Sequence, residues 1–396
     1  MTSSAFVTLI STACLMASVV VAADTTTLEA RFRAMPAQDE VVSADDWYQP
    51  TAIVKGVKRA SLKRSGKTTQ PSAQKNTAHY AAALDNAKRW DTLALVVLRN
   101  GQVELEYYAP GITGLTRFDT QSMHRGLLAL TVLAALEDGH FESLDAPAAR
   151  WLPEWGTSDD LRSRITLRDL LQSQSGLSDP PYENRLDSLG LQLFIGTDLR
   201  SLLASRTAEV PRATRWRGNA IDSQALGLIL ERATGEPYAR YLSRRIWKRL
   251  GASDAVVQLD REGGNTRTFC CLKSTAQDWA RVGELVRTGG SFDGRRILQS
   301  TTIKELLAPS PLNAASGMSW LLEPVALVPR SLRNAPPVAL TPFAEAGVAY
   351  IGGRGGQRVY VVPSQDAVVV RIGKIRNDFD DGRFLNPFID ALKSTP

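Results

Sequence analysis

The sequence predicts a mixed α+β domain whose sheet is built from both ends of the folded region. Strand-like segments lie at 93–111 and 347–373, while the chain between about 140 and 260 carries apolar residues three and four apart, as helices do. Internal repeats are absent. Strands that frame a long helical stretch favour a single α/β core with a helical domain inserted into it.

The boundaries follow from the same pattern. We expect the domain to occupy about 86–375, with its α/β part at 86–139 and 265–375 and its helical part at 140–264. A C-terminal helix or tail, 376–396, completes the 396-residue chain.

The first 23 residues predict export. Residues 5–23 are apolar and uncharged, and Val21-Ala22-Ala23 offers small residues for cleavage, so we expect a signal peptide and a periplasmic or extracellular protein. The apolar run is nearly long enough to stay in the membrane, so an uncleaved N-terminal anchor is the alternative. Residues 24–85 are polar, and we expect a partly flexible segment that ends in a helix at 78–90.

Charge and composition exclude several partners. The net charge is +6, and the basic run at 55–67 lacks interleaved aromatic residues, so we expect a solvated arm and no nucleic-acid groove. The three histidines are scattered, and we expect neither a metal site nor a cofactor. Cys270 and Cys271 are expected to be small buried packing residues that do not bond each other, because neighbouring cysteines form a strained ring.

The first elements of the domain are a hairpin and a long helix. Residues 93–111 read as two strands around Asn100-Gly101, a strong signal for a two-residue turn. The next helix begins at Ser122 and ends at Gly139. It is apolar nearly all the way round, so we expect it to be buried at the centre of the molecule.

Helices at 165–177, 222–251 and 274–290 follow, the second broken near Gly235 and Pro237. The segment 347–373 then predicts two or three strands, with a turn at Pro363-Ser364.

Several collinear segments carry a family resemblance. SMHRG (122–126), ITLRDLLQSQSGL, SQALGLILERATG and STAQDWARVGELVRTGG occur in this order over about 85–375. The chain thereby resembles the penicillin-recognising serine hydrolases: class C β-lactamases, D-alanyl-D-alanine carboxypeptidases, esterases and 6-aminohexanoate-dimer hydrolases. The resemblance implies a β-lactamase-like antiparallel sheet flanked by helices, and amide or ester hydrolysis through a serine acyl-enzyme.

The first catalytic motif is altered. By resemblance Ser122 is the nucleophile, at a helix start that favours developing negative charge. Arg125 takes the place of the lysine of Ser-x-x-Lys. A guanidinium stays protonated, so Arg125 cannot accept the serine proton.

The second motif is altered too. In RWRGNAIDSQALG the tyrosine place of Tyr-x-Asn holds Gly218 and the asparagine place holds Ala220. A register shifted by one puts Asn219 in the asparagine place, as a possible substrate contact, but still supplies no phenol. Tyr182 is the nearby tyrosine that could serve as a base instead.

The third motif resembles Gly-x-Gly-Gly-Gln at 353–357. Glycines on an edge strand admit substrate closely, so Gly355, Gly356 and Gln357 are expected at the oxyanion or substrate site, and Arg354 is expected to bind a carboxylate. A glycine-rich hairpin turn is the plain alternative. His124 lies two residues after Ser122 and points to another helix face, so no Ser-His-Asp triad is predicted.

Two functions remain open. One is a serine hydrolase acting on a small-molecule or peptide-like amide or ester, with low or lost activity. The other is a binding or regulatory pseudoenzyme of the cell envelope. The sequence fixes neither the substrate nor the oligomeric state.

Overall fold

A computed structural model describes residues 27–37, 40–44, 47–58, 62–64, 78–156, 159–325 and 340–394. The predicted signal peptide or anchor lies outside these residues, as do residues 59–61 and 65–67 of the basic run. No helix within the described ranges is long and apolar enough to cross a membrane.

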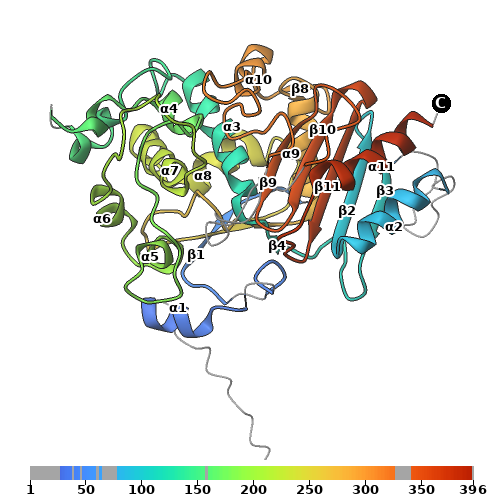
Figure 1. Ribbon diagram of the computed structural model, residues 1–396, viewed down its shortest axis with the longest axis horizontal. Helices are drawn as coiled ribbons and strands as arrows, with labels where there is room; N and C mark the ends of the chain where they lie inside the picture. The colour runs from blue at the N-terminus through green and yellow to red at the C-terminus, as the bar shows by residue number, and fades with distance from the viewer. Residues whose placement is uncertain are drawn as a thin grey trace, which may run out of the picture.

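The main sheet confirms the predicted α+β architecture. It has five antiparallel strands in the order β3-β2-β11-β10-β9. Two strands come from the start of the domain and three from its end (Figure 1). Their bounds are Thr92–Arg99 (β2), Gln102–Tyr108 (β3), Ala349–Gly353 (β9), Gln357–Val362 (β10) and Ala367–Gly373 (β11).

Helices cover both faces of this sheet, which explains why its central strands read as continuous apolar runs. On one face, α2 (Ala81–Arg89) and α11 (Asp381–Lys393) pack on alternate strand residues such as Leu95 and Val369. On the other face, α9 (Ala276–Arg287) packs on the intervening residues (Figure 1).

The predicted turns are present. Arg99 pairs with Gln102, so Asn100 and Gly101 form the two-residue turn, both with positive φ (51° and 72°). The twist of such a turn matches that of the flanking strands. Pro363–Gln365 forms the short connection between β10 and β11.

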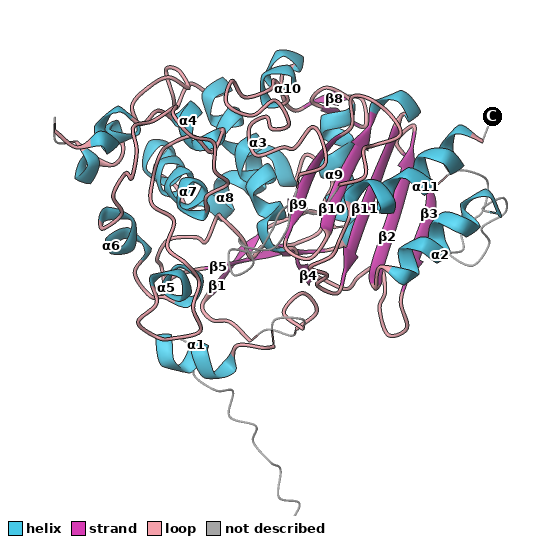
Figure 2. Cartoon of the chain, in the orientation of Figure 1, coloured by secondary structure: helices cyan, strands magenta, loops and turns pink. Residues whose placement is uncertain are grey.

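The helix that follows Ser122 is α3, His124–Glu137, and it lies buried at the centre as predicted. The helical part lies beside the sheet (Figure 2). Its longest helix, α7, ends at Gly235 in the left-handed region, and Pro237 precedes the next helix. The remaining helices are Leu167–Leu171 (α4), Leu189–Ile195 (α5), Leu199–Ala204 (α6), Ala220–Thr234 (α7), Tyr238–Leu242 (α8) and Ser300–Leu306 (α10).

A second, smaller sheet joins the N-terminal segment to the site. Its order is β1-β5-β6-β4, formed by Thr51–Val54, Ala255–Gln258, Lys273–Ser274 and Phe118–Asp119. Strand β4 leads directly into the turn that carries Ser122. A separate short ribbon pairs β7 (Ser291–Phe292) with β8 (Arg295–Arg296).

Part of the polar N-terminal segment packs on the domain. Helix α1 (Leu28–Ala34) is anchored by Arg31, whose buried guanidinium donates to the carbonyls of Gln49, Ile195, Gly196 and Asp260. Polar composition gave no sign of this packing, because the anchor is a single arginine satisfied by backbone carbonyls.

The cysteine prediction is partly wrong. Cys270 and Cys271 are buried, as expected, but they are joined in a disulfide. Cys271 has a left-handed backbone (φ 72°), so the alternation that separates neighbouring side chains in extended chain does not hold there.

Candidate functional site

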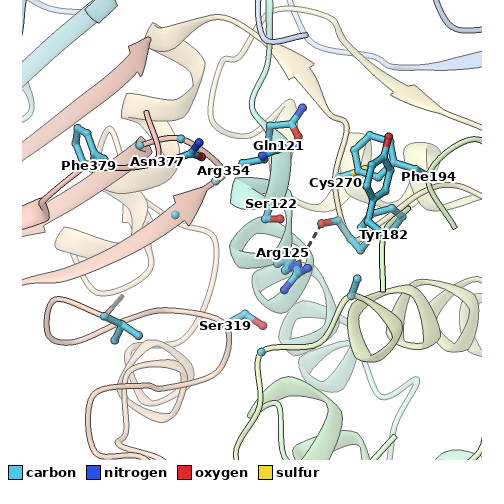
Figure 3. Close-up of a pocket in the computed structure, with 18 of the residues that line it drawn as sticks. Gln121, Ser122, Arg125, Tyr182, Phe194, Cys270, Ser319, Arg354, Asn377 and Phe379 are labelled. Atoms are coloured by element: carbon cyan, nitrogen blue, oxygen red, sulfur yellow. Dashed lines mark hydrogen bonds between the residues drawn. The ribbon is translucent and has the colours of Figure 1, made fainter. Parts of the chain in front are cut away.

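A pocket of about 510 Å³ opens between the edge strand β9, the start of α3 and the helical part (Figure 3). Ser122 and Arg125 lie on it, with Gly218 and the glycine-rich turn 352–356. Three residues of the N-terminal segment, Met35, Pro36 and Val41, also line it.

Ser122 is the middle residue of a 3-10 turn, Gln121–Met123, immediately before α3. Its side chain is half-buried at the pocket. The start of a 14-residue helix supplies free N–H groups and a positive partial charge. The position therefore suits a hydroxyl on which negative charge develops.

Two neighbours hold this turn in place. The N–H and hydroxyl of Thr120 both donate to the carbonyl of Leu272 (3.3 and 3.0 Å). Gln121 has φ 54°, unusual for a side chain of its size, and hydrogen-bonds Asp119. Burial raises the pKa of Asp119 to about 6.

Arg125 lies one turn beyond Ser122 and donates from Nε to the carbonyl of Phe269 (3.2 Å; Figure 3). Burial lowers the pKa of Arg125 to about 10, against an opposing effect from Asp222. The guanidinium is therefore still a cation at neutral pH. In the position of the family lysine, this chain holds a group that cannot act as a base.

Asp222 is a functional candidate that the sequence reading missed. It lies buried in the first turn of α7, where its Oδ1 accepts from the Ser175 hydroxyl (2.5 Å) and its Oδ2 has no partner within the described part of the chain. Burial, the largest cause, raises the pKa of Asp222 to about 8. The signal was an acidic residue inside IDSQALGLIL, which reads as an ordinary helix-start residue.

The structure places Gly218 and Ala220 on the pocket and turns Asn219 away from it. Asn219 caps α7 by accepting from the Ile221 N–H (2.8 Å), and it donates to the carbonyl of Leu177 (3.0 Å). The suggested substrate contact for Asn219 is therefore wrong, because both ends of its amide already serve the backbone. The geometry favours the register with Gly218 in the tyrosine place.

Gly218 leaves room for a side chain. A Cβ at this position would meet nothing within 4 Å among the described residues, and its backbone is not in the left-handed region. The position therefore has open space for the first atom of a side chain, in a backbone conformation that other residues adopt.

Tyr182 lines the pocket at its partly exposed rim. Its ring packs edge-on against Phe194, its hydroxyl lies 3.9 Å from the Met35 sulfur, and in Figure 3 that hydroxyl is directed away from Ser122. The structure thus does not bring Tyr182 to Ser122 as a base.

The glycine-rich segment is a tight turn between β9 and β10, as the plain alternative predicted. Gly353 pairs with Gln357, and Gly355 and Gly356 have positive φ (71° and 89°). Both glycines line the pocket with Arg354. Gln357 does not: its buried amide bonds Gly373 and the carbonyl of Arg354, because β10 is an inner strand. The side chain of Gln357 is therefore engaged away from the pocket, and the oxyanion role suggested for the N–H of Gly356 or Gln357 stays a prediction.

The edge of β9 offers a different donor. Tyr350 exchanges both backbone hydrogen bonds with Leu321, outside the sheet. Because strand residues alternate, the N–H of Gly352, two residues on, faces the same open edge, and Gly352 lines the pocket.

Arg354 is a second cation of the pocket, placed at the exposed tip of the turn. Its pKa is lowered, chiefly by burial, with an opposing effect from Tyr182. It forms no ion pair within the described ranges, so a carboxylate ligand remains its predicted partner.

His124 is structural. One ring nitrogen contacts the carbonyl of Cys270 (2.7 Å) and the other the hydroxyl of Tyr238 (2.8 Å). Burial lowers the pKa of His124 to about 4. Neither nitrogen is left to serve Ser122. Among the described residues, no group of three His, Cys, Asp or Glu side chains could hold a metal ion.

Comparisons with known proteins bear on the family and the fold. The family model described as Beta-lactamase matches residues 34–392. The chain is 27% identical over 234 residues to 6-aminohexanoate-dimer hydrolase of Paenarthrobacter ureafaciens, covering 55% of this chain and 57% of that protein. It is 33% identical over 153 residues to esterase EstB of Burkholderia gladioli, covering 35% and 38%. The matches therefore span about half the length of these relatives, or less.

Solved structures show the same fold. A class C β-lactamase from Rhodobacter sphaeroides superposes with a TM-score of 0.56 at 20% identity, over 80% of this chain and 99% of that one. A penicillin-binding protein homologue from Caulobacter crescentus gives 0.60 at 16% identity, over 80% and 98%. At this identity the likeness shows a β-lactamase-like fold alone.

Proposed function

Because the chain belongs to the β-lactamase family, we propose that it is a serine hydrolase in which Ser122 takes the acyl group of a small amide or ester, with slow turnover. The observation that carries the proposal is the position of Ser122: at the start of α3, on an open pocket, beside Arg125 and the empty space at Gly218. The relatives named above support the substrate class, and the N-terminal sequence supports export.

The chemistry would begin with attack of the Ser122 oxygen on the substrate carbonyl. A new C–O bond forms, the carbonyl oxygen becomes an oxyanion, and the hydroxyl proton has to leave. The N–H groups of Ser122 and Gly352 are the candidate donors to that oxyanion. Collapse of this tetrahedral intermediate expels the amine or alcohol, which takes up a proton. Water later attacks the acyl-enzyme and releases the acyl group as a carboxylic acid.

Proton removal is the weak step. Arg125 is cationic, His124 is neutral but engaged on both nitrogens, and no phenol stands at 218. Water in the open space at Gly218 is the remaining acceptor, and it is a poor base. Loss of one member of such a group commonly removes several powers of ten in rate, so slow turnover follows.

The second candidate is a binding or regulatory protein of the cell envelope. The specific observation in its favour is Arg125, which changes the lysine place from a proton acceptor to a fixed positive charge. In that case the pocket would bind ligand without covalent chemistry.

Intact mass after incubation with a fluorophosphonate, and separately with a penicillin, tests the proposal. We expect one adduct, absent from Ser122→Ala and mapped to the peptide that contains Ser122. Ser319→Ala is the matched control, since Ser319 is another pocket serine, and it should keep the adduct. A protein that never becomes labelled supports the binding function instead.

A further inference from the structure

The floor of the pocket carries a positive charge that no carboxylate of the described residues pairs with directly. Two other pocket arginines are paired: Arg358 with Asp381 (2.6 Å), and Arg376 with Asp91 and Asp378 (2.8 and 2.7 Å). Arg125, in contrast, has no carboxylate within 4 Å among the described residues, and its Nε donates to the backbone carbonyl of Phe269.

Asp222, when ionised, is the acid that acts electrostatically on Arg125. Its surroundings keep the carboxyl uncharged near pH 7. Burial opposes ionisation most strongly and the nearby Asp169 adds to it, while the Ser175 hydroxyl, Arg125 and Arg217 act in the other direction. The resulting pKa of Asp222, about 8, leaves the carboxyl mostly protonated at neutral pH. Its Oδ2 has no hydrogen-bond partner within the described part of the chain.

A half-buried cation that lacks an ion pair within the described part of the chain attracts an anion into the pocket, because the low dielectric around it strengthens the attraction. The start of α3 adds a partial positive charge in the same place, and the Ser122 hydroxyl adds a donor. Three independent features therefore favour a negative group between Ser122 and Arg125.

The walls favour an apolar body for the same ligand. Rings line much of the pocket, and the open space at Gly218 adds room beside them. The volume of about 510 Å³ is that of an ordinary small-molecule site. The aromatic residues concerned are Tyr182, Phe194, Trp216, Phe269 and Phe379.

We propose that this pocket binds monocarboxylates with an apolar, preferably aromatic, body, and that the carboxylate lies between Ser122 and Arg125. The inference rests on the proposed function in placing the ligand at Ser122, but it requires no covalent step. For a slow hydrolase, such compounds are product-like inhibitors. For a binding protein, they are the ligand class.

Calorimetric titration at pH 7 with 3-phenylpropionate, 3-phenylpropanamide, 3-phenylpropanol and 3-phenylpropylamine tests the charge requirement in the unmodified protein. We expect the carboxylate to bind at least tenfold more tightly than the amide or the alcohol, and the amine to bind most weakly. Equal affinity for the carboxylate and the alcohol would overturn the proposal.

Variants locate the site. Arg125→Gln should weaken 3-phenylpropionate at least tenfold, whereas Arg240→Gln, at an exposed arginine away from the pocket, should leave it unchanged. Arg354→Gln separates the contributions of Arg125 and Arg354, the two pocket arginines that form no ion pair among the described residues. If it abolishes binding while Arg125→Gln does not, the carboxylate sits at the tip of the turn and the assignment is wrong.

The pH dependence of the affinity distinguishes an electrostatic role of Asp222 from a packing role, because a packing role would not depend on its ionisation. As pH rises from 7 to 9 the carboxyl ionises and compensates Arg125, so affinity for 3-phenylpropionate should fall several-fold. In Asp222→Asn this fall should disappear. A wild-type affinity that stays constant, or a fall that persists in Asp222→Asn, contradicts the mechanism.

The inference and the proposed function fail separately. Carboxylate binding without a fluorophosphonate adduct leaves the inference standing and removes the hydrolase, whereas an adduct without carboxylate preference does the reverse.

Discussion

Asp119 accepts two hydrogen bonds from Gln121 through the same oxygen, one from the backbone N–H (2.9 Å) and one from the side-chain amide (3.0 Å). Gln121 lies in the left-handed region (φ 54°), and Ser122 follows it directly. Such a backbone costs on the order of 1–3 kcal/mol in a non-glycine residue. Asp119 therefore stabilises the strained residue that directly precedes Ser122.

Asp119→Ala should release this strain and misplace Ser122. We expect fluorophosphonate labelling to slow by about tenfold or more and the free energy of unfolding to fall by about 1–3 kcal/mol, because buried donors of Gln121 lose their acceptor. Labelling rate and urea unfolding measure the two effects.

A second substitution separates positioning from general damage. Glycine accepts positive φ without strain, so Asp119→Ala/Gln121→Gly should recover part of the labelling rate. If Asp119→Ala labels as fast as the wild type, the carboxylate does not position the nucleophile.

The fold followed from patterns that need no tertiary context. Apolar runs at both ends, the Asn100-Gly101 turn and the helix-ending Gly235 each predicted the element that the structure contains. Packing of helix α1 on the domain was not predictable, because the contacts that hold it are made by Arg31 with distant carbonyls.

The site was predictable only where residue type decides the chemistry. Ser122, Arg125 and Gly218 lie together on one pocket. Asn219 does not line it, because a side-chain amide can turn towards backbone or ligand, and sequence does not say which. Asp222 was missed because its properties come from burial, which appears only in three dimensions.

Restoring the altered motifs should raise turnover. A Cβ at 218 meets open space, so Gly218→Tyr can place a phenol in the pocket, and Arg125→Lys replaces a permanent cation with a group that can lose its proton. We expect the double variant to hydrolyse a short-chain nitrophenyl ester at least tenfold faster than the wild type, measured as kcat/KM.

Arg125→Lys/Gly218→Phe is the matched control, because it supplies the ring without the hydroxyl, and it should stay near the wild-type rate. If Arg125→Lys/Gly218→Tyr hydrolyses the ester no faster than the wild type, the loss of the base residues is not what limits turnover in this pocket.

Alanine should lower the stability of the protein at one glycine of the pocket and leave it nearly unchanged at another. At Gly356 the backbone is left-handed (φ 89°) and a Cβ would lie 2.6 Å from the Phe379 ring, so Gly356→Ala should lower the free energy of unfolding by about 1–3 kcal/mol. Gly218→Ala should change it by less than about 0.5 kcal/mol. Urea unfolding of both variants checks this; equal losses would contradict the packing described for the β9–β10 turn.

His124 should make the protein less stable in acid. Its pKa is about 4 in the folded chain because of burial, against about 6.5 when unfolded, so the unfolded state binds more protons between these values. Stability should therefore fall as pH is lowered from 6.5 to 4, by roughly 3 kcal/mol from this residue. His124→Gln should lose that part of the pH dependence, and His140→Gln, at a loop histidine, should keep it.

Since both nitrogens of His124 are engaged away from Ser122, the fluorophosphonate labelling rate should show no inflection near pH 6.5. An inflection there that disappears in His124→Gln would give this histidine a part in the chemistry.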